Sequence, residues 1–244
     1  MGCGGNESVS VQKDNLQIQE TGQFHALNEE EKEKIKNQIE QQDKNLEEPV
    51  IEEVPYNEFD WDALNKKLPI KKTGEERKER LKLWNQINEY GNGYISYKRL
   101  STQLTKYLKL PEVVRNKGPI KLAFDAASDK YEKYGVKKQD NLIEWMEFRI
   151  FLVYLRQYFE YWVMFERMDN SGDKQISFEE FEKAIPLMEK WGVKIDDPQQ
   201  EFKRIDVNGG GTLTFDEFCS YAIKKSLDLE TDDNFDDEEL KNLK

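Results

Sequence analysis

Two stretches of the chain place oxygen-bearing side chains at alternating positions, which is the pattern of a calcium-binding loop. The first stretch reads FERMDNSGDKQISFEEF and runs from Phe165 to Phe181. Calcium is a hard cation that takes about six to eight oxygen ligands, and an EF-hand loop supplies them from positions 1, 3, 5, 7, 9 and 12. In this loop the predicted ligands are Asp169, Ser171, Asp173, the backbone carbonyl of Gln175, Ser177 and the bidentate carboxylate of Glu180. We call it the Asp169 loop.

The second stretch, FKRIDVNGGGTLTFDEF, repeats the pattern from Phe202 to Phe218. Its predicted ligands are Asp206, Asn208, the backbone carbonyl of Thr212, Thr214 and Glu217. Gly210 at position 5 has no side chain, so water must supply that ligand. Either loop alone would also fit an acidic turn in solvent. Because the flanking apolar residues repeat at the same offsets, the two stretches together favour a pair of calcium sites over two such turns.

The two loops differ at position 6, where the backbone normally turns with a positive φ. In the second stretch, which we call the Asp206 loop, Gly211 occupies this position. In the Asp169 loop Lys174 occupies it. A residue with a Cβ in that conformation costs about 1–2 kcal/mol. The Asp169 loop has three ligand carboxylates on a strained turn, whereas the Asp206 loop has two on a relaxed turn. The sequence therefore does not rank the two affinities.

An upstream stretch keeps the shape of an EF-hand without its ligands. LWNQINEYGNGYISYKRL, from Leu83 to Leu100, has apolar residues where the first helix needs them and a glycine at loop position 6. Its loop has Asn88 at position 1, Tyr90 at position 3 and Arg99 at position 12. A guanidinium at position 12 repels a cation, so we expect no calcium in this Asn88 loop.

A fourth unit is indicated by AFDAASDKYEKYGVKKQDNLIEWMEF, from Ala123 to Phe148. Its end matches an EF-hand, with Ile143 at position 8 and Glu147 at position 12. If Ser128 is position 1, the loop carries additional, lysine-rich residues that break the ligand cage. We expect this loop to bind no calcium either.

These units predict an all-α fold of four EF-hand units in two pairs, because an EF-hand buries its apolar face only against a partner. Short strands should join each pair, Tyr94 to Ser96 with Leu142 to Glu144, and Gln175 to Ser177 with Thr212 to Thr214. The expected divisions are an acidic, acylated, flexible arm (1–56), an N-terminal pair with a leading helix (57–155), a calcium-binding C-terminal pair (156–226) and an acidic tail (227–244). The stretch from Trp145 to Met168 is interrupted by charges, which makes it a poor membrane span and a plausible buried helix pair.

Charge and composition narrow the class of protein. The net charge is −12, and it is concentrated in the disordered arm and tail that this composition predicts. Such a charge opposes nucleic-acid binding. We expect no enzyme, because the single histidine, His25, lies in the polar arm and no nucleophile with a base is visible. The only cysteines, Cys3 and Cys219, lie near opposite ends, which fits a reducing compartment. No secretory signal follows Met1.

The region from Trp61 to about Asp233 resembles the calflagins, the flagellar calcium-binding proteins of kinetoplastid protozoa. The resemblance rests on WDALNKKLPIKKTGEERKERLKLW, LIEWMEFRIFLVYLRQYFEYWVMFERMD, FEKAIPLMEKWGVKIDDPQQEFKRID and GTLTFDEF. It implies a calcium sensor held by N-terminal acyl chains on the cytoplasmic side of the ciliary or flagellar membrane. It also implies two Ca²⁺ sites, in the Asp169 and Asp206 loops, and lipids on Gly2 and Cys3. The long acidic arm departs from the family pattern.

The first residues, MGCGGN, are a near match to an acylation signal. Gly2 is the acceptor for myristate, but the motif prefers Ser or Thr where this chain has Asn6. One myristoyl chain binds a membrane only marginally, so a palmitate on Cys3 would be needed for a stable attachment. An unmodified glycine-rich start is the alternative. A basic cluster at residues 66–82 could add attraction to anionic lipid, or it could simply be a solvated helix face.

Two functions follow from the sequence. In the first, calcium opens the C-terminal pair and exposes an apolar face to an unidentified protein partner or to lipid. In the second, the protein is a structural axonemal protein, a scaffold or a calcium buffer, and the ions stabilise the fold. A calcium titration of hydrophobic-dye binding and a detergent fractionation would separate these functions.

Overall fold

The computed structural model describes residues 29–47, 64, 66–109, 117–129 and 142–227. Its helices are α1 (Glu29–Lys44), α3 (Gly74–Ile87), α4 (Tyr97–Leu108), α6 (Gly118–Asp129), α7 (Trp145–Met168), α8 (Phe178–Lys190), α9 (Pro198–Ile205) and α10 (Phe215–Lys225). Its strands are β1 (Tyr94–Ser96), β2 (Leu142–Glu144), β3 (Ile176–Ser177) and β4 (Thr212–Leu213). The proposed lipid sites Gly2 and Cys3, most of the acidic tail and the insertion at 130–141 lie outside the described residues.

The strands pair as the loop spacing predicts. Strand β1 lies antiparallel to β2 with Ile95 opposite Ile143, and β3 lies antiparallel to β4 with Ile176 opposite Leu213. All four of these position-8 side chains are fully buried. The β3–β4 ladder is shorter than expected, with two residues a strand instead of three. The helical class and the pairing of loops are therefore confirmed.

Helices α4, α8 and α10 begin at position 10 of the loops that they follow, and a hydroxyl side chain at position 9 caps each of them. Ser96, Ser177 and Thr214 accept a hydrogen bond from the backbone N–H three residues later, at the start of α4, α8 and α10. Ser, Thr, Asp and Asn are the side chains that best satisfy the free N–H groups of a first helical turn. In α8 and α10 the residue at position 12 is a glutamate that completes a capping box. The loop and the helix that follows it are thus one local unit.

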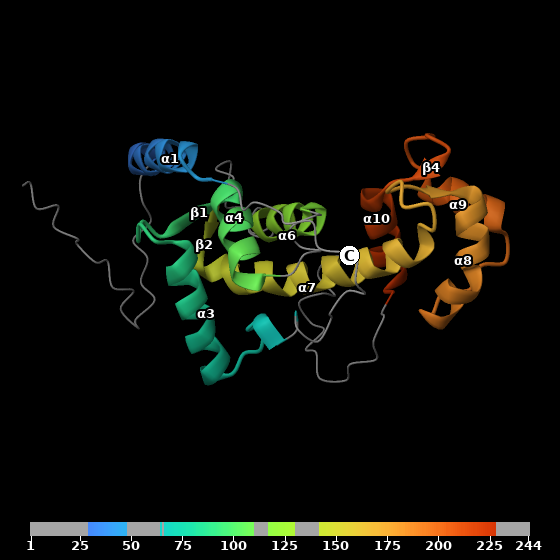
Figure 1. Ribbon diagram of the computed structural model, residues 1–244, viewed down its shortest axis with the longest axis horizontal. Coiled ribbons are helices and arrows are strands. Elements are labelled where there is room, and N and C mark those ends of the chain that lie inside the picture. The colour runs from blue at the N-terminus through green and yellow to red at the C-terminus, as the bar shows by residue number, and fades with distance from the viewer. Residues whose placement is uncertain (1–28, 48–63, 65, 110–116, 130–141, 228–244) are drawn as a thin grey trace, which may run out of the picture.

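Helix α7 is a single continuous helix from Trp145 to Met168, where we expected two. It belongs both to the unit that ends at Phe148 and to the one that contains the Asp169 loop, so the expected boundary at 155/156 lies inside it. Figure 1 shows it running lengthwise from β2 on the left to the helices of the C-terminal pair on the right. Every residue from 150 to 165 is buried. This part of the helix is therefore stabilised by packing on all sides.

The core is one contiguous cluster that runs through both pairs. Aromatic rings dominate its two ends. Trp84 of α3 meets Phe148 of α7 at a centroid distance of 5.2 Å, and Phe165 of α7 meets Phe218 of α10 at 5.8 Å. No helix among the described residues is both long enough and apolar enough to cross a membrane.

The arm expected at residues 1–56 contains a helix, α1, which corrects the expectation of a wholly flexible segment. Its residues are mostly good helix formers. Ile35 is partly buried, and Ile39 and Asp43, one and two turns further on, are buried. This face lies against the N-terminal pair near β1 and α4 (Figure 1). The acidic composition of the segment gave no indication that a few of its residues contact the body.

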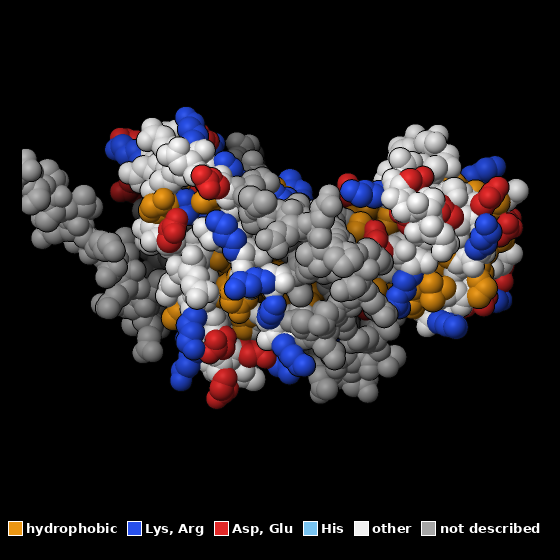
Figure 2. Space-filling model, viewed as in Figure 1, with side chains coloured by type: hydrophobic (Ala, Val, Ile, Leu, Met, Phe, Trp, Pro, Cys, Tyr) orange, Lys and Arg blue, Asp and Glu red, His pale blue; other side chains and the backbone are white. Residues whose placement is uncertain are grey.

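The basic cluster at residues 66–82 is partly neutralised by its neighbours. Arg80 is buried and donates hydrogen bonds to the backbone carbonyls of Pro69 and Lys71 at 2.8 and 2.7 Å. Lys82 pairs with Glu79 at 2.7 Å. Figure 2 shows Lys and Arg side chains interspersed with acids over the same face. This arrangement favours a solvated helix face over a membrane-binding patch.

Candidate metal centre

In the Asp169 loop the residues at positions 1, 3 and 12 meet. The backbone N–H of Ser171 donates to Glu180 Oε1 at 2.9 Å, and its hydroxyl donates to Asp169 Oδ1 at 3.1 Å. Asp169 is 7% exposed and Glu180 is 8% exposed, although the residues between positions 2 and 7 lie in solvent. The loop therefore holds two carboxylates on its inner side, at the two ends of the predicted ligand set.

The backbone of the loop turns inward through left-handed residues at positions 4 and 6. Gly172 has φ 74° and Lys174 has φ 66°, and their N–H groups donate to the two oxygens of Asp169, both at 2.8 Å. The Asp206 loop has the same two left-handed positions, with Gly211 at φ 80°. The predicted positive φ of Lys174 is therefore confirmed, and its strain lies at the ligand-bearing turn.

We predict that Lys174→Gly raises the free energy of unfolding of the calcium-free protein by about 0.5–1 kcal/mol. Relief of left-handed strain contributes about 1–2 kcal/mol, and the greater freedom of glycine in the unfolded chain offsets part of it. The measurement is urea unfolding followed by circular dichroism. Lys174→Ala is the control, because it removes the same charge but keeps the Cβ. Equal stability of the two variants would contradict the assignment of strain to this backbone.

The Asp206 loop is built in the same way. Asp206 accepts hydrogen bonds from the N–H groups of Gly210 and Gly211 at 2.9 and 3.0 Å. Glu217 accepts from the N–H of Asn208 at 3.1 Å and from the hydroxyl of Thr214 at 2.7 Å. Positions 1 and 12 again face the interior of the loop. Asn208 Oδ1 accepts the N–H of Gly210 at 2.6 Å, so the position-3 side chain lies against the backbone of position 5.

The two loops are joined at position 7. Besides the β3–β4 ladder, the hydroxyl of Thr212 donates to Gln175 Oε1, so the side chains of both position-7 residues meet. Their backbone carbonyls are the predicted calcium ligands. Backbone and side-chain hydrogen bonds thus connect the two loops next to these predicted ligands.

The position-12 carboxylates are held in the ionised form. Burial raises the pKa of Glu180, but hydrogen bonds from Ser177 and Ser171 lower it more, and its pKa is below the ordinary value. The pKa of Glu217 is lowered for the same reason, by bonds from Thr214, Asn208 and Val207 against the effect of burial. Both side chains are therefore negatively charged at neutral pH, the form that calcium requires.

The donor set fits calcium. An open hollow of about 550 Å³ lies at the Asp169 loop, and its lining includes Asn170, Ser171, Asp173, Ser177, Glu179, Glu180 and Lys183. Within the described ranges no three His, Cys, Asp or Glu side chains gather into a compact cluster. A hard cation is instead served by hydroxyl, amide and carbonyl oxygens between two carboxylates. All eleven predicted ligand residues lie on the two loops, and their role as ligands stays a prediction.

Among the residues that the structure describes, the loops of the N-terminal pair present no comparable donor set. At position 12 of the Asn88 loop Arg99 is buried, 2% exposed. In the fourth unit Glu147 accepts a hydrogen bond from the N–H of Glu144 at 2.8 Å, which keeps the capping geometry. Most of the loop before it lies at 130–141, outside the described residues.

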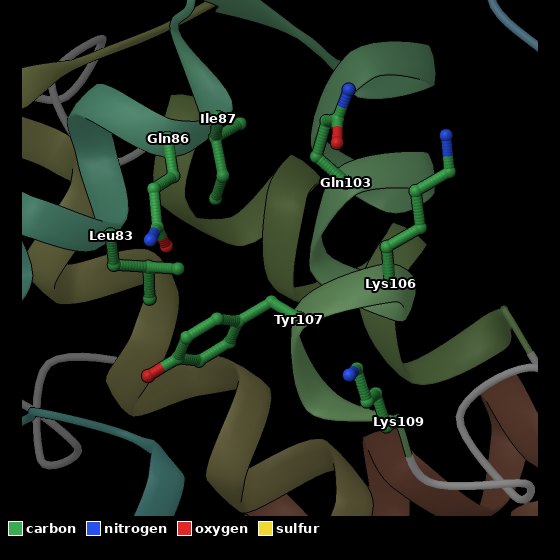
Figure 3. A pocket seen from close by; sticks show the side chains of 7 residues that line it. All are labelled: Leu83, Gln86, Ile87, Gln103, Lys106, Tyr107 and Lys109. Atoms are coloured by element: carbon green, nitrogen blue, oxygen red, sulfur yellow. The ribbon is translucent and has the colours of Figure 1, made fainter.

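One further hollow, of about 410 Å³, lies between α3 and α4 of the N-terminal pair. Figure 3 shows Leu83 and Ile87 of α3 facing Tyr107 of α4 across it, with Gln103, Lys106 and Lys109 at its edge. Sequence reasoning did not find it, because its walls are the ordinary faces of two EF-hand helices. It holds no cluster of carboxylates and lies apart from the calcium loops.

The fold and the loop geometry define a protein of the EF-hand class with two loops suited to calcium. Comparison with known proteins agrees: residues 64–155 match the FCaBP EF-hand domain, and residues 161–223 match the EF-hand domain pair. A flagellar calcium-binding protein of Trypanosoma cruzi is 35% identical over 173 residues, which is 70% of this chain and 82% of that protein. Flagellar calcium-binding protein TB-1.7G of Trypanosoma brucei brucei is 35% identical over 180 residues, 73% of this chain and 78% of that protein.

The chain belongs to the flagellar calcium-binding protein family, the calflagins. The resemblance read from the sequence is thereby confirmed.

Proposed function

We propose that this protein is a flagellar calcium sensor held at the cytoplasmic face of the membrane by acyl groups on Gly2 and Cys3. The observation that carries the calcium part is a hydrogen-bond pattern repeated in two loops joined by β3 and β4. In both loops the position-12 carboxylate accepts the N–H of position 3, and the position-1 carboxylate accepts the N–H of position 6. The relatives are named flagellar calcium-binding proteins, which supports calcium binding and a location in the flagellum. The membrane attachment rests on the first residues of the chain.

The sensor role needs a conformational change that exposes apolar surface. In the C-terminal pair Phe181, Met188 and Phe218 are fully buried. These side chains lie on the helices that follow the two loops. Calcium drawn between position 1 and position 12 would pull α8 and α10 relative to the helices before the loops. Only a higher calcium affinity of the open form can shift the populations.

A calcium titration in the presence of a hydrophobic dye tests this sensor role. We expect dye fluorescence to rise with calcium in the wild type and to stay flat in the double variant Glu180→Gln, Glu217→Gln, whose loops lack the position-12 carboxylates. Calorimetry on the same samples reports binding separately. Calcium binding without a dye response would favour the second candidate, a buffer or structural protein whose ions only stabilise the fold.

We predict that Gly2→Ala releases the native protein from the membrane fraction completely, whereas Cys3→Ser releases it in part. A single myristoyl chain binds with a constant of about 10⁴ M⁻¹, which leaves an equilibrium between membrane and solution. Intact mass of each native protein shows which acyl groups are present. A wild-type mass equal to the bare chain would remove the anchor, and retention after detergent would place the protein on a structural partner instead.

A further inference from the structure

The C-terminal end of α1 contacts the Asn88 loop through one buried carboxylate. Asp43 is 6% exposed, and its Oδ1 lies 3.0 Å from both Nε and Nη2 of Arg99. Its Oδ2 accepts the hydroxyl of Ser96. Its backbone carbonyl accepts a hydrogen bond from Lys98 Nζ. Three side chains of the N-terminal pair, from the end of β1 and the start of α4, thus converge on a single residue of α1.

Arg99 is the centre of this arrangement. Its Nη1 lies 2.8 Å from Glu89 Oε1, and its guanidinium stacks over the Tyr90 ring at 4.5 Å. Burial lowers the pKa of Arg99, but the hydrogen bond to Glu89 and the charge of Asp43 raise it more, so the guanidinium is held as a cation. A buried cation requires such partners, because its desolvation is otherwise costly.

The Asn88 loop keeps the backbone of a calcium loop. Gly91 and Gly93, at positions 4 and 6, have φ 64° and 83°. Asn92 Oδ1 accepts the N–H of Tyr94 at 3.1 Å, as Asp173 Oδ1 accepts that of Gln175 at 2.9 Å in the Asp169 loop. The Asn88 loop differs from the two predicted calcium loops in its charge at position 12, where Arg99 is positive and the glutamates of the other two loops are negative.

Among the side chains of α1 that the structure describes, few are buried against the body. An isolated helix of this length is marginal in water, so contacts with the body must stabilise it. Its buried side chains are Ile39 and Asp43, one turn apart on the same face. The ion pair is therefore a large part of the attachment.

We propose that the Asn88 loop is a cation site filled permanently by the guanidinium of Arg99, and that Asp43 acts as its carboxylate ligand in place of a metal-binding loop residue. The pair clamps α1 to the body independently of calcium. Helix α1 is then a fixed point on the fold. A lipid on Gly2 or Cys3 is separated from it only by the residues before Glu29. The clamp does not depend on acylation or on the sensor role.

Hydrogen exchange of the full-length protein, measured with and without calcium, tests the clamp. We expect the α1 amides of the wild type to be protected equally in both conditions. Asp43→Ala should speed their exchange by roughly 10- to 100-fold, since it removes one partner of a buried pair. Glu40→Ala, which changes an exposed acid of the same helix, is the control and should leave the exchange unchanged.

Two further variants guard against general unfolding. Asp43→Asn keeps the shape of the side chain and removes only its charge, so it should accelerate α1 exchange while the β1 and β2 amides stay protected. In the double variant Asp43→Ala, Arg99→Ala, α1 should exchange no faster than in Asp43→Ala alone. Unprotected α1 amides in the wild type, or protection that survives Asp43→Ala, would overturn the proposal. So would α1 protection that appears only with calcium.

Discussion

Replacement of Glu180 by glutamine is expected to lower the calcium affinity of the Asp169 loop by on the order of 100-fold. Glutamine keeps the length of the side chain and one oxygen that can accept the N–H of Ser171. It loses the negative charge and the second oxygen, so it cannot bind calcium in a bidentate manner. The calcium-free loop should therefore stay folded while its strongest ligand is lost.

Isothermal titration calorimetry measures the effect directly. The wild type should bind two calcium ions, and Glu180→Gln should bind one in the same concentration range. Glu179→Gln is the matched control, because Glu179 is adjacent, exposed and not a predicted ligand. Glu217→Gln should remove the other site in the same way. If the Glu180 and Glu179 variants bind alike, the Asp169 loop is not a calcium site.

The same titration reports the link between the loops. Thr212 and Gln175 join the loops at position 7, next to the predicted carbonyl ligands. Loss of calcium from the Asp169 loop should therefore weaken binding at the Asp206 loop as well, by less than the direct effect. Independent sites would show no such change.

The sequence predicted those parts of the structure that depend on short spacings. The ligands of a loop, the strand at position 8 and the helix cap at position 9 lie within a few residues of one another in the chain. A local sequence pattern therefore predicts how they are arranged. Ile95 opposite Ile143 and Ile176 opposite Leu213 follow from this spacing once two loops are paired. The left-handed turn at Lys174 follows from it too.

The remaining features depend on contacts between distant residues. Asp43 meets Arg99 across 56 positions of the chain, and no local pattern marks an acidic residue in a polar arm as a partner for a buried arginine. The spacing of Ile35, Ile39 and Asp43 was the available signal for a helical face. The continuity of α7 was missed because charged residues such as Arg156 and Glu160 interrupt the apolar stretch. Both side chains are buried in the fold.

Replacement of Phe165 by alanine is expected to lower the free energy of unfolding by about 3–5 kcal/mol. Phe165 is fully buried, and its ring centroid lies 5.5 Å from that of Phe215 and 5.8 Å from that of Phe218. Alanine leaves a cavity among the rings, and α7 and α10 would have to move closer together to fill it. The loss should shift the thermal midpoint of the calcium-free protein by roughly 6–20 °C.

The number of unfolding transitions tests whether α7 couples the two pairs. Because the core is contiguous and α7 belongs to both pairs, Phe165→Ala should lower one common midpoint, although the change lies in the C-terminal pair. Differential scanning calorimetry measures it, with tryptophan fluorescence as a second probe. Met146→Ala, on the same helix but 57% exposed, is the control and should shift the midpoint little. Two separate transitions, with only one displaced by Phe165→Ala, would show that the pairs unfold independently and that α7 is a connector without cooperative coupling.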